Sequence, residues 1–558
     1  MTQANKRRLA IVGGGSSGLI CLKHAVEMLP DWEVICFEKS GTILGCWGRP
    51  YTGFVSTSTK YTTQFSTYAM YDSHCHVDGG ASRSEFFREG EYGEYLQSFS
   101  NQYQLSEHIR LFQKVERLRR DESGQFWELD VRNVNELNSQ VNTFRFDAVI
   151  IATGLAAVAK EVASEVRVGS LADLNQSDRA LPIRGERIVV LGGGESAVDY
   201  AVRLSKPELQ NTVFLSLYTG IRVSPRYHPI RGVPSDFLRN RLMLSIHEDI
   251  RNWIGERFVR FRILYQERME RWFPRRQVAH DASPTAVRNS IEKSSEVAVH
   301  DARKHWAYLL TKAAKDDLFN MFHNKSDDFL DSVANGRITI VGPATDSSYR
   351  ICKSFESQAD IEVNATLLIP SIGYRSTLED LAPERLFLKD FYLGLSHVQF
   401  PNLFLVGFAR PIIGNIPSIS EMQARCVMSI LSGGIELPSD MAKQHETNAR
   451  HNQKRFANLN RNAIYPVEMF PYCDHLADWL DQSPTIRRVG SLWKWWRIQL
   501  SPATTMHYWC QDEGVRSKYE ASPIYMPTVL IVLLLGLKPL DWSYRALLRV
   551  SRSMRGKS

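Results

Sequence analysis

The glycine-rich segment at residues 13–18 constrains the possible folds of this chain more than any other stretch. It reads G-x-G-x-x-G, with Gly13, Gly15 and Gly18 as its glycines. The apolar run at residues 9–12 precedes it, and a helix-like pattern at residues 19–29 follows. Such glycines allow a tight turn and bring the backbone close to a pyrophosphate that faces a helix N-terminus. The segment therefore predicts a dinucleotide-binding βα turn.

An acid in the expected place strengthens this prediction. Glu38 directly follows the apolar run at residues 34–37, about 20 residues after the last glycine. At this position of a dinucleotide-binding fold a carboxylate binds ribose hydroxyls. A loop of small residues with Gly45 and Trp47 comes next. A purely structural βα turn is the alternative, but strand, glycines, helix, second strand and acid together favour the dinucleotide site.

Several elements are predicted before the next glycine motif. They are a hydroxyl-rich run at residues 54–66, a helix at 91–103, a strand meander at 109–118, 127–131 and 144–146, and a buried strand at 147–154. The hydroxyl-rich run is either an edge strand or part of the lining of the cofactor site. The buried strand closes on Thr153 and Gly154, as strands do that lead from a flavin domain to a second nucleotide domain.

A second glycine motif follows the apolar run at residues 188–191. Gly192 and Gly194 occupy the first two glycine positions, and Ala197 occupies the third, where a small side chain still permits close packing of helix on strand. Glu195 and Ser196 lie between them. This motif predicts a second nucleotide-binding turn.

The residues after the next strand bear on the choice of nucleotide. The strand at residues 212–216 ends without an acid, and Thr219, Arg222 and Arg226 follow. Because an arginine suits a ribose 2′-phosphate, the pattern favours NADPH, and NADH is not excluded. A solvated loop is the alternative explanation for both arginines.

Length and composition exclude several classes of protein. The 558 residues exceed what one core holds, so two or three domains are expected. The net charge of +7 is not gathered into a basic stripe, which argues against nucleic-acid binding. The eight cysteines are scattered without zinc spacing, and no secretion signal precedes the first strand, so we expect a reduced, cytoplasmic protein without a metal site.

The rest of the chain completes the predicted domain organisation. A stretch of mixed helical character covers about residues 224–331, and apolar strands are predicted at 338–342, 365–374 and 402–408. A helix is predicted to start at Ile419, after a loop containing Pro417. The predicted fold is α/β, with two Rossmann-like domains, the second inserted in the first, and a mostly helical C-terminal extension. Its parts are the first segment of one nucleotide-binding domain (1–156), a second nucleotide-binding domain (157–343), the second segment of the first domain (344–445) and the extension (446–558).

Taken together, these motifs resemble the flavin-containing monooxygenases (dimethylaniline-monooxygenase-like), a family of class B flavoprotein oxygenases. The resemblance covers nearly the whole chain and is weakest at about residues 235–335. It rests on both glycine motifs, on the segments at 37–39, 45–47, 57–66 and 152–154, and on those at 216–226, 232–234 and 421–425. The resemblance implies FAD for the first domain (1–156 and 344–445) and NAD(P)H for the second (157–343).

Three departures from the family pattern are visible. The signature F-x-G-x-x-x-H aligns with residues 167–173, where only Gly169 is kept. Thr57 stands where the family usually has an asparagine three residues before Lys60. Leu217 and Tyr218 replace the expected pair of arginines. These departures bear on the substrate class and the pyridine nucleotide more than on the fold or FAD.

The resemblance implies that NADPH reduces FAD, that O₂ adds at flavin C4a, and that a small soft nucleophile takes one oxygen atom from the resulting C4a-(hydro)peroxyflavin. The cofactor carries this chemistry, and the protein positions the rings and excludes water. Candidates for polar groups near the reactive edge of the flavin are Thr57, Ser58 and Lys60. The expected cofactor-binding residues are Gly13, Gly15, Ser16, Ser17, Gly18, Glu38, Lys39, Gly45, Trp47, Thr153, Gly154, Gly192, Gly194, Glu195, Ser196, Thr219, Arg222, Arg226, Glu421 and Gln423.

Other activities remain open at this stage. A Baeyer–Villiger or N-hydroxylating monooxygenase uses the same cofactors, and a flavin oxidase or reductase transfers electrons without inserting oxygen. A membrane-tethered binding protein without turnover is an alternative of another class. The expected partners are a small substrate, O₂ and a membrane surface.

The membrane prediction rests on the C-terminus. Residues 523–537 form an uncharged, largely apolar run, which is shorter than the roughly 20 residues of a spanning helix. A basic stretch at residues 545–557 follows. This pattern favours a segment lying in the membrane interface. A buried helix docked on the protein body is the alternative.

Overall fold

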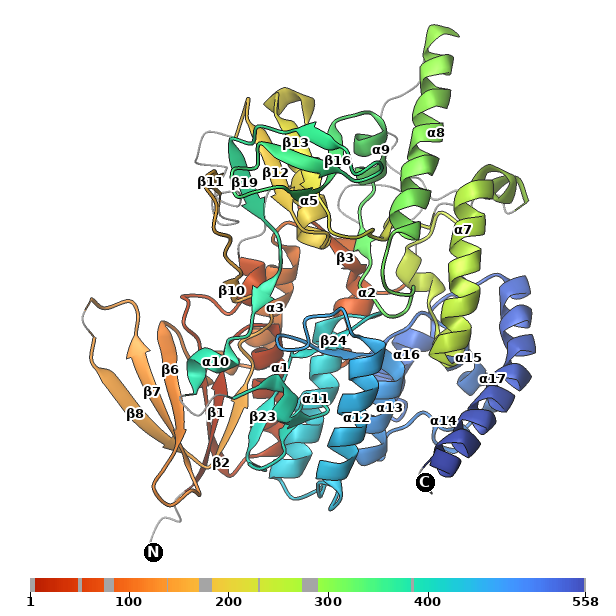
Figure 1. Ribbon diagram of the computed structural model, residues 1–558. Coiled ribbons are helices and arrows are strands. Elements are labelled where there is room, and N and C mark those ends of the chain that lie inside the picture. Colours follow the sequence, from red (N-terminus) through yellow and green to blue (C-terminus); the bar gives the residue numbers. More distant parts are fainter. Residues whose placement is uncertain are drawn as a thin grey trace, which may run out of the picture.

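The computed structural model describes residues 6–48, 53–74, 85–137, 139–169, 183–228, 231–272, 290–382 and 386–555. Two mainly parallel sheets of seven strands, with helices packed around them, form its frame (Figure 1). The fold is the predicted α/β architecture.

The first sheet contains the strand before the first glycine motif. Its order is β21 (Phe391–Tyr392), β22 (Ser396–His397), β23 (Leu403–Leu405), β9 (Ala148–Ile151), β1 (Arg7–Val12), β2 (Trp32–Phe37) and β5 (Ile109–Arg110). The strands β23, β9, β1, β2 and β5 are parallel. The buried parts of β23, β9, β1 and β2 are continuous apolar runs, as expected for parallel strands that are covered on both faces.

The second sheet contains the strand before the second glycine motif. Its order is β11 (Arg167–Val168), β19 (Leu367–Pro370), β12 (Arg187–Leu191), β13 (Thr212–Ser216), β16 (Ile338–Ala344), β17 (Ile351–Ser354) and β18 (Asp360–Glu362). All of these strands lie in sequence between β9 and β21 of the first sheet. The second domain is therefore inserted in the first, as predicted.

The predicted boundary at residue 343 falls inside this second sheet and needs correction. The strand β19 was expected to return to the first domain, but it pairs with β12 in parallel, with Val189 opposite Leu368. Buried apolar strands look alike in sequence, so only the long-range pairing shows which sheet a strand joins.

Two smaller sheets extend the first domain. The meander is β6 (Gln113–Arg120), β7 (Trp127–Asn133) and β8 (Val141–Phe146). The predicted strand at residues 109–118 is divided, because Phe112 has a left-handed φ of 59° between β5 and β6. The hydroxyl-rich run forms β3 (Val55–Thr59), which pairs with β4 (Phe86–Arg88), and then α2 (Lys60–Thr63).

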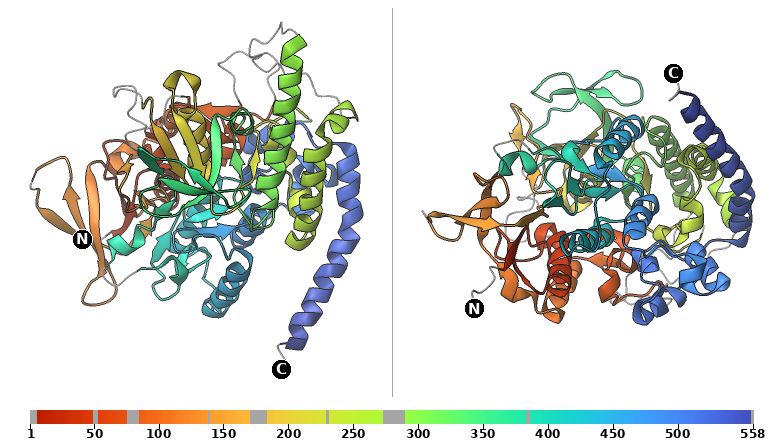
Figure 2. Two further views of the ribbon diagram at one scale, coloured as in Figure 1. Left: turned by 45° about the horizontal axis from the view of Figure 1, so that its top comes forward. Right: turned by 90° about the horizontal axis from the view of Figure 1, so that it is seen from below.

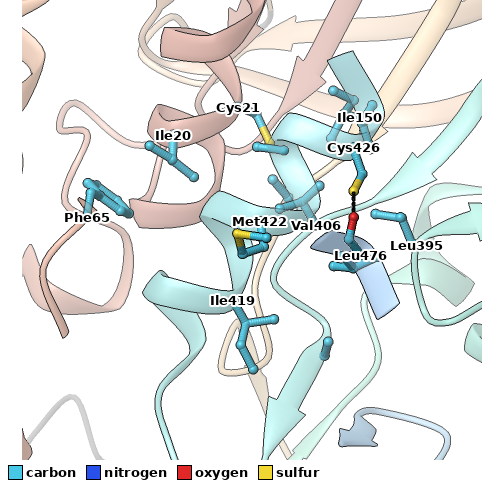
Figure 3. Packing of buried hydrophobic residues seen from close by; sticks show 14 of the residues in the cluster. Ile20, Cys21, Phe65, Ile150, Leu395, Val406, Ile419, Met422, Cys426 and Leu476 are labelled. Atoms are coloured by element: carbon cyan, nitrogen blue, oxygen red, sulfur yellow. Dashed lines mark hydrogen bonds between the residues drawn. The ribbon is translucent and has the colours of Figure 1, made fainter. Parts of the chain in front are cut away.

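The helices beside the first sheet form the largest core. It includes side chains of α1 (Ser16–Met28), α3 (Glu91–Gln102), α11 (Ile416–Leu431) and α13 (Met469–Trp479). Figure 3 shows Ile20 and Cys21 of α1 near Met422 and Ile419 of α11. The Asn415 side chain caps α11, so Pro417 lies in the first turn of this helix and not in the loop predicted before it.

The insertion predicted at about residues 224–331 is mostly helical. The insertion contributes α6 (Arg241–Leu244), α7 (Glu248–Trp272), α8 (Ser290–Lys312) and α9 (Phe329–Ala334), together with β14 (Val223–Ser224) and β15 (Asn324–Lys325). The second motif is followed by α5 (Glu195–Leu204). Residues 273–289 of the predicted insertion lie outside the described residues, as do 170–173 of the stretch aligned with the family signature.

The C-terminal extension is mostly helical, as predicted. It includes α12 (Met441–Arg455), β25 (Tyr465–Val467), α14 (Ile486–Val489), α15 (Leu492–Leu500), α16 (Glu513–Glu520) and α17 (Thr528–Arg555). Figure 2 shows α17 as a long helix along one side of the molecule. Residues 556 and 557 of the basic stretch lie outside the described residues. Among the helices of the described residues, none has both the length and the apolar character needed to span a membrane.

Candidate functional site

A cavity of about 570 Å³ is lined by residues from both halves of the protein. The first glycine turn contributes Gly13, Gly15, Ser16 and Ser17, and the second contributes Glu195. Of the other expected residues, Glu38, Lys39, Gly45, Trp47, Thr57, Ser58, Thr153 and Gly154 also line it. The structure thus brings most of the predicted first-motif residues together around one space.

The first turn can be built only from glycine at two of its positions. Gly13 has a φ of +107°, and a Cβ there would lie 2.6 Å from the carbonyl oxygen of Ala152. A Cβ on Gly18, which lies inside α1, would come within 1.8 Å of the carbonyl oxygen of Gly13. These close approaches hold the N-terminus of α1 against the end of β1, where its free N–H groups face the cavity.

The carboxylate of Glu38 is held in place by the main chain around it. One oxygen accepts the N–H of Gly14 at 2.7 Å, and the other accepts the N–H and the hydroxyl of Ser40, both at 2.8 Å. The side chain is buried and lines the cavity. Because a carboxylate accepts about four hydrogen bonds, acceptor capacity remains for ribose hydroxyls.

Small residues keep the space beside this turn open. A Cβ on Gly15 would lie 3.4 Å from the Cα of Gly45, which belongs to η1 (Gly45–Gly48). The ring of Trp47 packs on Tyr92 at a centroid distance of 4.6 Å. Gly154 has a φ of +78° with nothing within 4 Å of its Cβ position. The helix N-terminus, the fixed acid and this open strip together fit the pyrophosphate and ribose of FAD.

The three candidate catalytic residues are not equivalent in the structure. Thr57 and Ser58 line the cavity. Lys60 does not, because its ammonium group pairs with Glu91 at 3.0 Å and lies 5.6 Å from the centre of the Tyr71 ring. The chain turns from β3 into α2 at this residue, which directs the side chain away.

The second turn repeats the geometry of the first. Gly192 has a φ of +114°, and a Cβ there would lie 2.4 Å from the carbonyl oxygen of Ser371. A Cβ on Gly194 would meet nothing within 4 Å. Gly192, Gly194 and Ser196 stand at the N-terminus of α5 but do not line the cavity of the first motif; Glu195 does.

The three residues expected to bind the 2′-phosphate of NADPH contact other protein groups instead. Arg222 bonds the carboxylate of Glu256 at 2.5 Å and lines a different cavity. Arg226 donates to the carbonyl oxygens of Ser56 and Val55, at 2.9 and 2.7 Å, and pairs with Asp327 at 3.2 Å. The hydroxyl of Thr219 contacts the carbonyl of Gly220 at 3.4 Å. The structure does not bring these three residues into the first cavity.

The two expected residues of α11 are buried beneath the cavity. Glu421 accepts the N–H groups of Ser66 and Thr67, at 2.7 and 3.1 Å. Gln423 accepts the N–H of Gly407 at 3.1 Å and donates to the hydroxyl of Tyr472 at 2.8 Å. The start of α11 reaches the cavity instead through Ile416 and Pro417, next to its cap Asn415.

Sequence analysis missed a group of charged residues in the cavity wall. Asp236 pairs with Lys325 at 2.5 Å, and Arg239 lies 3.9 Å from the same carboxylate. Burial acts to raise the pKa of Asp236, but Lys325 and Arg239 outweigh it and hold that pKa below its usual value. Burial lowers the pKa of Lys325, and Asp236 offsets this only in part.

This charged pair joins the two halves of the site. Asp236 also accepts the N–H of Thr59 at 3.0 Å, at the end of β3. Next to Lys325, the Asn324 amide donates to the carbonyl of Gly193 in the second turn, at 2.8 Å. No local pattern predicts a pair separated by 89 positions. The only signal in the sequence is a weak one: Asp236 stands next to the apolar residue Phe237, which suggests that its carboxylate is buried.

Comparisons with known proteins identify the family. Residues 6–298 match the family described as flavin-binding monooxygenase-like. Flavin-containing monooxygenase 5 of Mus musculus is 24% identical over 542 residues, which cover 91% of this chain and 90% of that protein. The 4-hydroxybenzoate brominase (decarboxylating) of Marinomonas mediterranea is 22% identical over 459 residues, covering 79% of this chain and 77% of that protein.

Solved structures share the fold. A closed crystal structure of cyclohexanone monooxygenase has a TM-score of 0.57 at 14% identity and covers 85% of this chain and 97% of its own. Oxidized steroid monooxygenase bound to NADP has a TM-score of 0.56 at 14% identity and covers 86% and 98%. These likenesses confirm the predicted arrangement of two dinucleotide-binding domains.

The family match extends from the first glycine motif into the insertion and covers more than half of the chain. The protein is an oxidoreductase, a monooxygenase that uses FAD and NADPH. The chain therefore belongs to the flavin-binding monooxygenase-like family.

Proposed function

We propose that this enzyme transfers one oxygen atom from O₂ to the nitrogen or sulfur of a small organic substrate. The observation that carries the proposal is the shared cavity, in which the first turn, Glu38, Thr57 and Glu195 of the second turn line one space. When bound, FAD supplies the redox chemistry with O₂, and NADPH supplies the electrons. No acid–base pair or covalent nucleophile is required of the protein.

The residues of this chain bind and orient the cofactors. The N–H groups at the start of α1 would hold the flavin pyrophosphate, and Glu38 would accept hydrogen bonds from ribose hydroxyls. Gly194 and Ser196 at the start of α5 would hold the pyrophosphate of NADPH. Arg222 and Arg226 are weaker candidates for its 2′-phosphate, because each would have to leave a carboxylate partner.

Thr57 and Ser58 are the proposed polar groups at the reactive edge of the flavin. Thr57 lines the cavity from β3, and the carbonyl groups on either side of this strand segment are held by Arg226 and by the hydroxyl of Ser56, which donates to Ser58 at 2.7 Å. A threonine hydroxyl can donate one hydrogen bond and accept others. In this role Thr57 orients the nicotinamide amide and helps exclude water.

A product analysis tests the substrate class. The FAD-loaded enzyme is given NADPH, O₂ and, in turn, a methyl sulfide, a tertiary amine and a cyclic ketone. Sulfoxide or N-oxide formation with matching NADPH consumption supports the proposal. Lactone formation instead would favour a Baeyer–Villiger enzyme, the second candidate, which the fold shared with cyclohexanone monooxygenase favours. Hydrogen peroxide alone indicates an oxidase, and no NADPH consumption indicates a binding protein.

We also propose that the protein is cytoplasmic and meets a membrane surface through α17. Apolar side chains are exposed along this helix, among them Val532, Leu540 and Leu547 at 61, 56 and 68%, and Trp542 at 65%. Large apolar groups in contact with water commonly mark such a surface. The described cysteines are unpaired thiols, which suits a reducing compartment.

Flotation with vesicles of phosphatidylcholine and phosphatidylserine tests this second proposal. The combined replacement of Val532, Leu540 and Leu547 by serine is expected to abolish co-flotation. Leu137→Ser, at a side chain that is 99% exposed on the meander, is the matched control and is expected to float like the unchanged protein. Equal flotation of all three proteins would refute a role for α17.

A further inference from the structure

A second cavity, of about 490 Å³, is lined by residues of α7, α8 and α17. These helices lie on one side of the molecule (Figure 1). The volume of the cavity is in the range of small-molecule sites. The cavity adjoins the cofactor cavity, because Arg239, His323 and Ile413 line both. A molecule held in this second space is therefore adjacent to the cofactors.

The walls of the second cavity are apolar over most of their area. They include Leu238, Met243, Val259, Ile263, Leu310 and Leu530. The first turns of α17 close one side, so the apolar run at residues 523–537 has one face on this cavity and another in solvent. Such walls favour an aliphatic or aromatic body over a polar one.

The charged residues in the walls are all basic. Among the described residues that line the cavity there is no aspartate or glutamate, whereas arginines line it from several elements. Arg222 and Arg303 are paired with Glu256 and Asp331, which lie outside the lining. Two further arginines, Arg231 and Arg262, form no ion pair with an acid among the described residues.

These two arginines and His228 line the same cavity. Both act on His228, whose pKa falls to about 3 through burial and then through the charges of Arg262 and Arg231, so the imidazole is neutral. The Nε atom of Arg231 is buried without a hydrogen-bond partner. Burial lowers the pKa of Arg262, and no acid counteracts it. A buried donor without a partner and an uncompensated charge both destabilise the protein until an anion satisfies them.

We propose that the second cavity binds an organic anion with an apolar body, and that this is the substrate class of the enzyme. Arg231 and Arg262 bind the carboxylate, and the apolar walls hold the chain that reaches past Ile413 to the cofactors. The substrate role rests on the oxygenase function proposed above, whereas binding itself does not depend on turnover.

Calorimetry on the FAD-loaded protein with NADP⁺ tests binding without turnover. Decanoate, decanol and decyltrimethylammonium serve as probes of equal chain length. We expect decanoate to bind about tenfold or more tightly than the other two, since only the carboxylate accepts charge-assisted hydrogen bonds from the two arginines. Equal binding of the three probes, or preference for the cation, would overturn the proposal.

Variants locate the anion. Arg262→Met is expected to weaken decanoate binding about tenfold or more while leaving decanol binding and the affinity for NADPH unchanged. Arg262→Lys is expected to restore much of the loss. Arg257→Met is the matched control, because Arg257 is exposed on the same helix and packs on Trp253 at 4.1 Å. Weaker NADPH binding by Arg262→Met, with decanoate unaffected, would assign these cations to the nucleotide and refute the proposal.

A kinetic comparison separates this inference from the oxygenase proposal. The substrates are 6-(methylthio)hexanoate and its methyl ester, which differ in the charge of the carboxyl group and in one methyl group. Sulfoxidation with higher kcat/KM for the acid, lost in Arg262→Met, supports both proposals. Equal rates for acid and ester refute the anion preference alone. Tight decanoate binding with no oxygenation of either compound refutes the oxygenase proposal and leaves the binding site in place.

Discussion

Replacing Asp236 with asparagine removes the charge that compensates a buried lysine. The side chains of Asp236 and Lys325 are 10 and 7% exposed, and their atoms lie 2.5 Å apart. Removing one partner of a buried pair destabilises a protein by about 3–5 kcal/mol. Asparagine still accepts the N–H of Thr59, so we expect a loss near the lower end, about 3 kcal/mol. For 558 residues that unfold together, at about 2.1 cal/mol/K of unfolding entropy per residue, this lowers Tm by about 2–3 °C.

Replacing Lys325, alone and together with Asp236, completes a double-mutant cycle. Lys325→Met leaves Asp236 with Thr59 and with Arg239 at 3.9 Å, so its loss is expected to be smaller. The double variant is expected to lose less free energy of unfolding than the two single variants together, and the difference is expected to be about 1–3 kcal/mol. Glu33→Gln, in an exposed pair with Arg8, is the control and is expected to change stability by under about 1 kcal/mol.

Thermal unfolding followed by circular dichroism, with FAD fluorescence as a second probe, measures these changes. Bound FAD must be kept constant, because a ligand that binds the folded state raises Tm. A shift for Asp236→Asn no larger than that of Glu33→Gln, or strict additivity of the two replacements, would refute the buried pair as a link between the halves.

Three further predictions concern the same site. The pKa of Asp236 is lowered in the folded state, so the stability that its carboxylate contributes is complete above the unfolded pKa of about 4 and is lost as the pH falls further. Asp236→Asn should therefore flatten the fall of Tm at acid pH, and an unchanged profile of Tm against pH would contradict this role of Asp236. Glu38→Gln should weaken FAD binding about tenfold, measured by retention on dialysis, because the charge that strengthens hydrogen bonds to ribose is lost; full retention would contradict this role. Gly194→Ala should raise the KM for NADPH with little change in Tm, whereas Gly192→Ala should lower Tm markedly, because its Cβ would lie 2.4 Å from Ser371; equal Tm values for both would contradict the turn geometry.

Local patterns were sufficient to predict the two nucleotide-binding turns. Gly13 and Gly192 are required by positive φ and by close carbonyl oxygens, and each follows a buried parallel strand. The acid Glu38 follows at the end of the next strand. Motifs of this kind can be recognised from the sequence because their strand, turn and helix follow one another directly along the chain.

Long-range pairing and burial were not predictable in the same way. The sequence of β19 is as apolar as that of β23, yet the two belong to different sheets. The family resemblance placed Lys60 and Glu421 at the site, but in the structure Lys60 pairs with Glu91, and Glu421 accepts the N–H groups of residues 66 and 67. Asp236 and Lys325 line the cavity because η6 (Ser235–Leu238) and β15 meet only in the folded protein.

The fate of O₂ tests the central claim most directly. The purified enzyme, with its FAD content measured, is supplied with NADPH, ¹⁸O₂ and a methyl sulfide, and the sulfoxide is analysed by mass spectrometry. The account predicts about one FAD per chain and one ¹⁸O atom in the product for each NADPH consumed. Sulfoxide without the label, or NADPH consumption that yields only hydrogen peroxide, would contradict it.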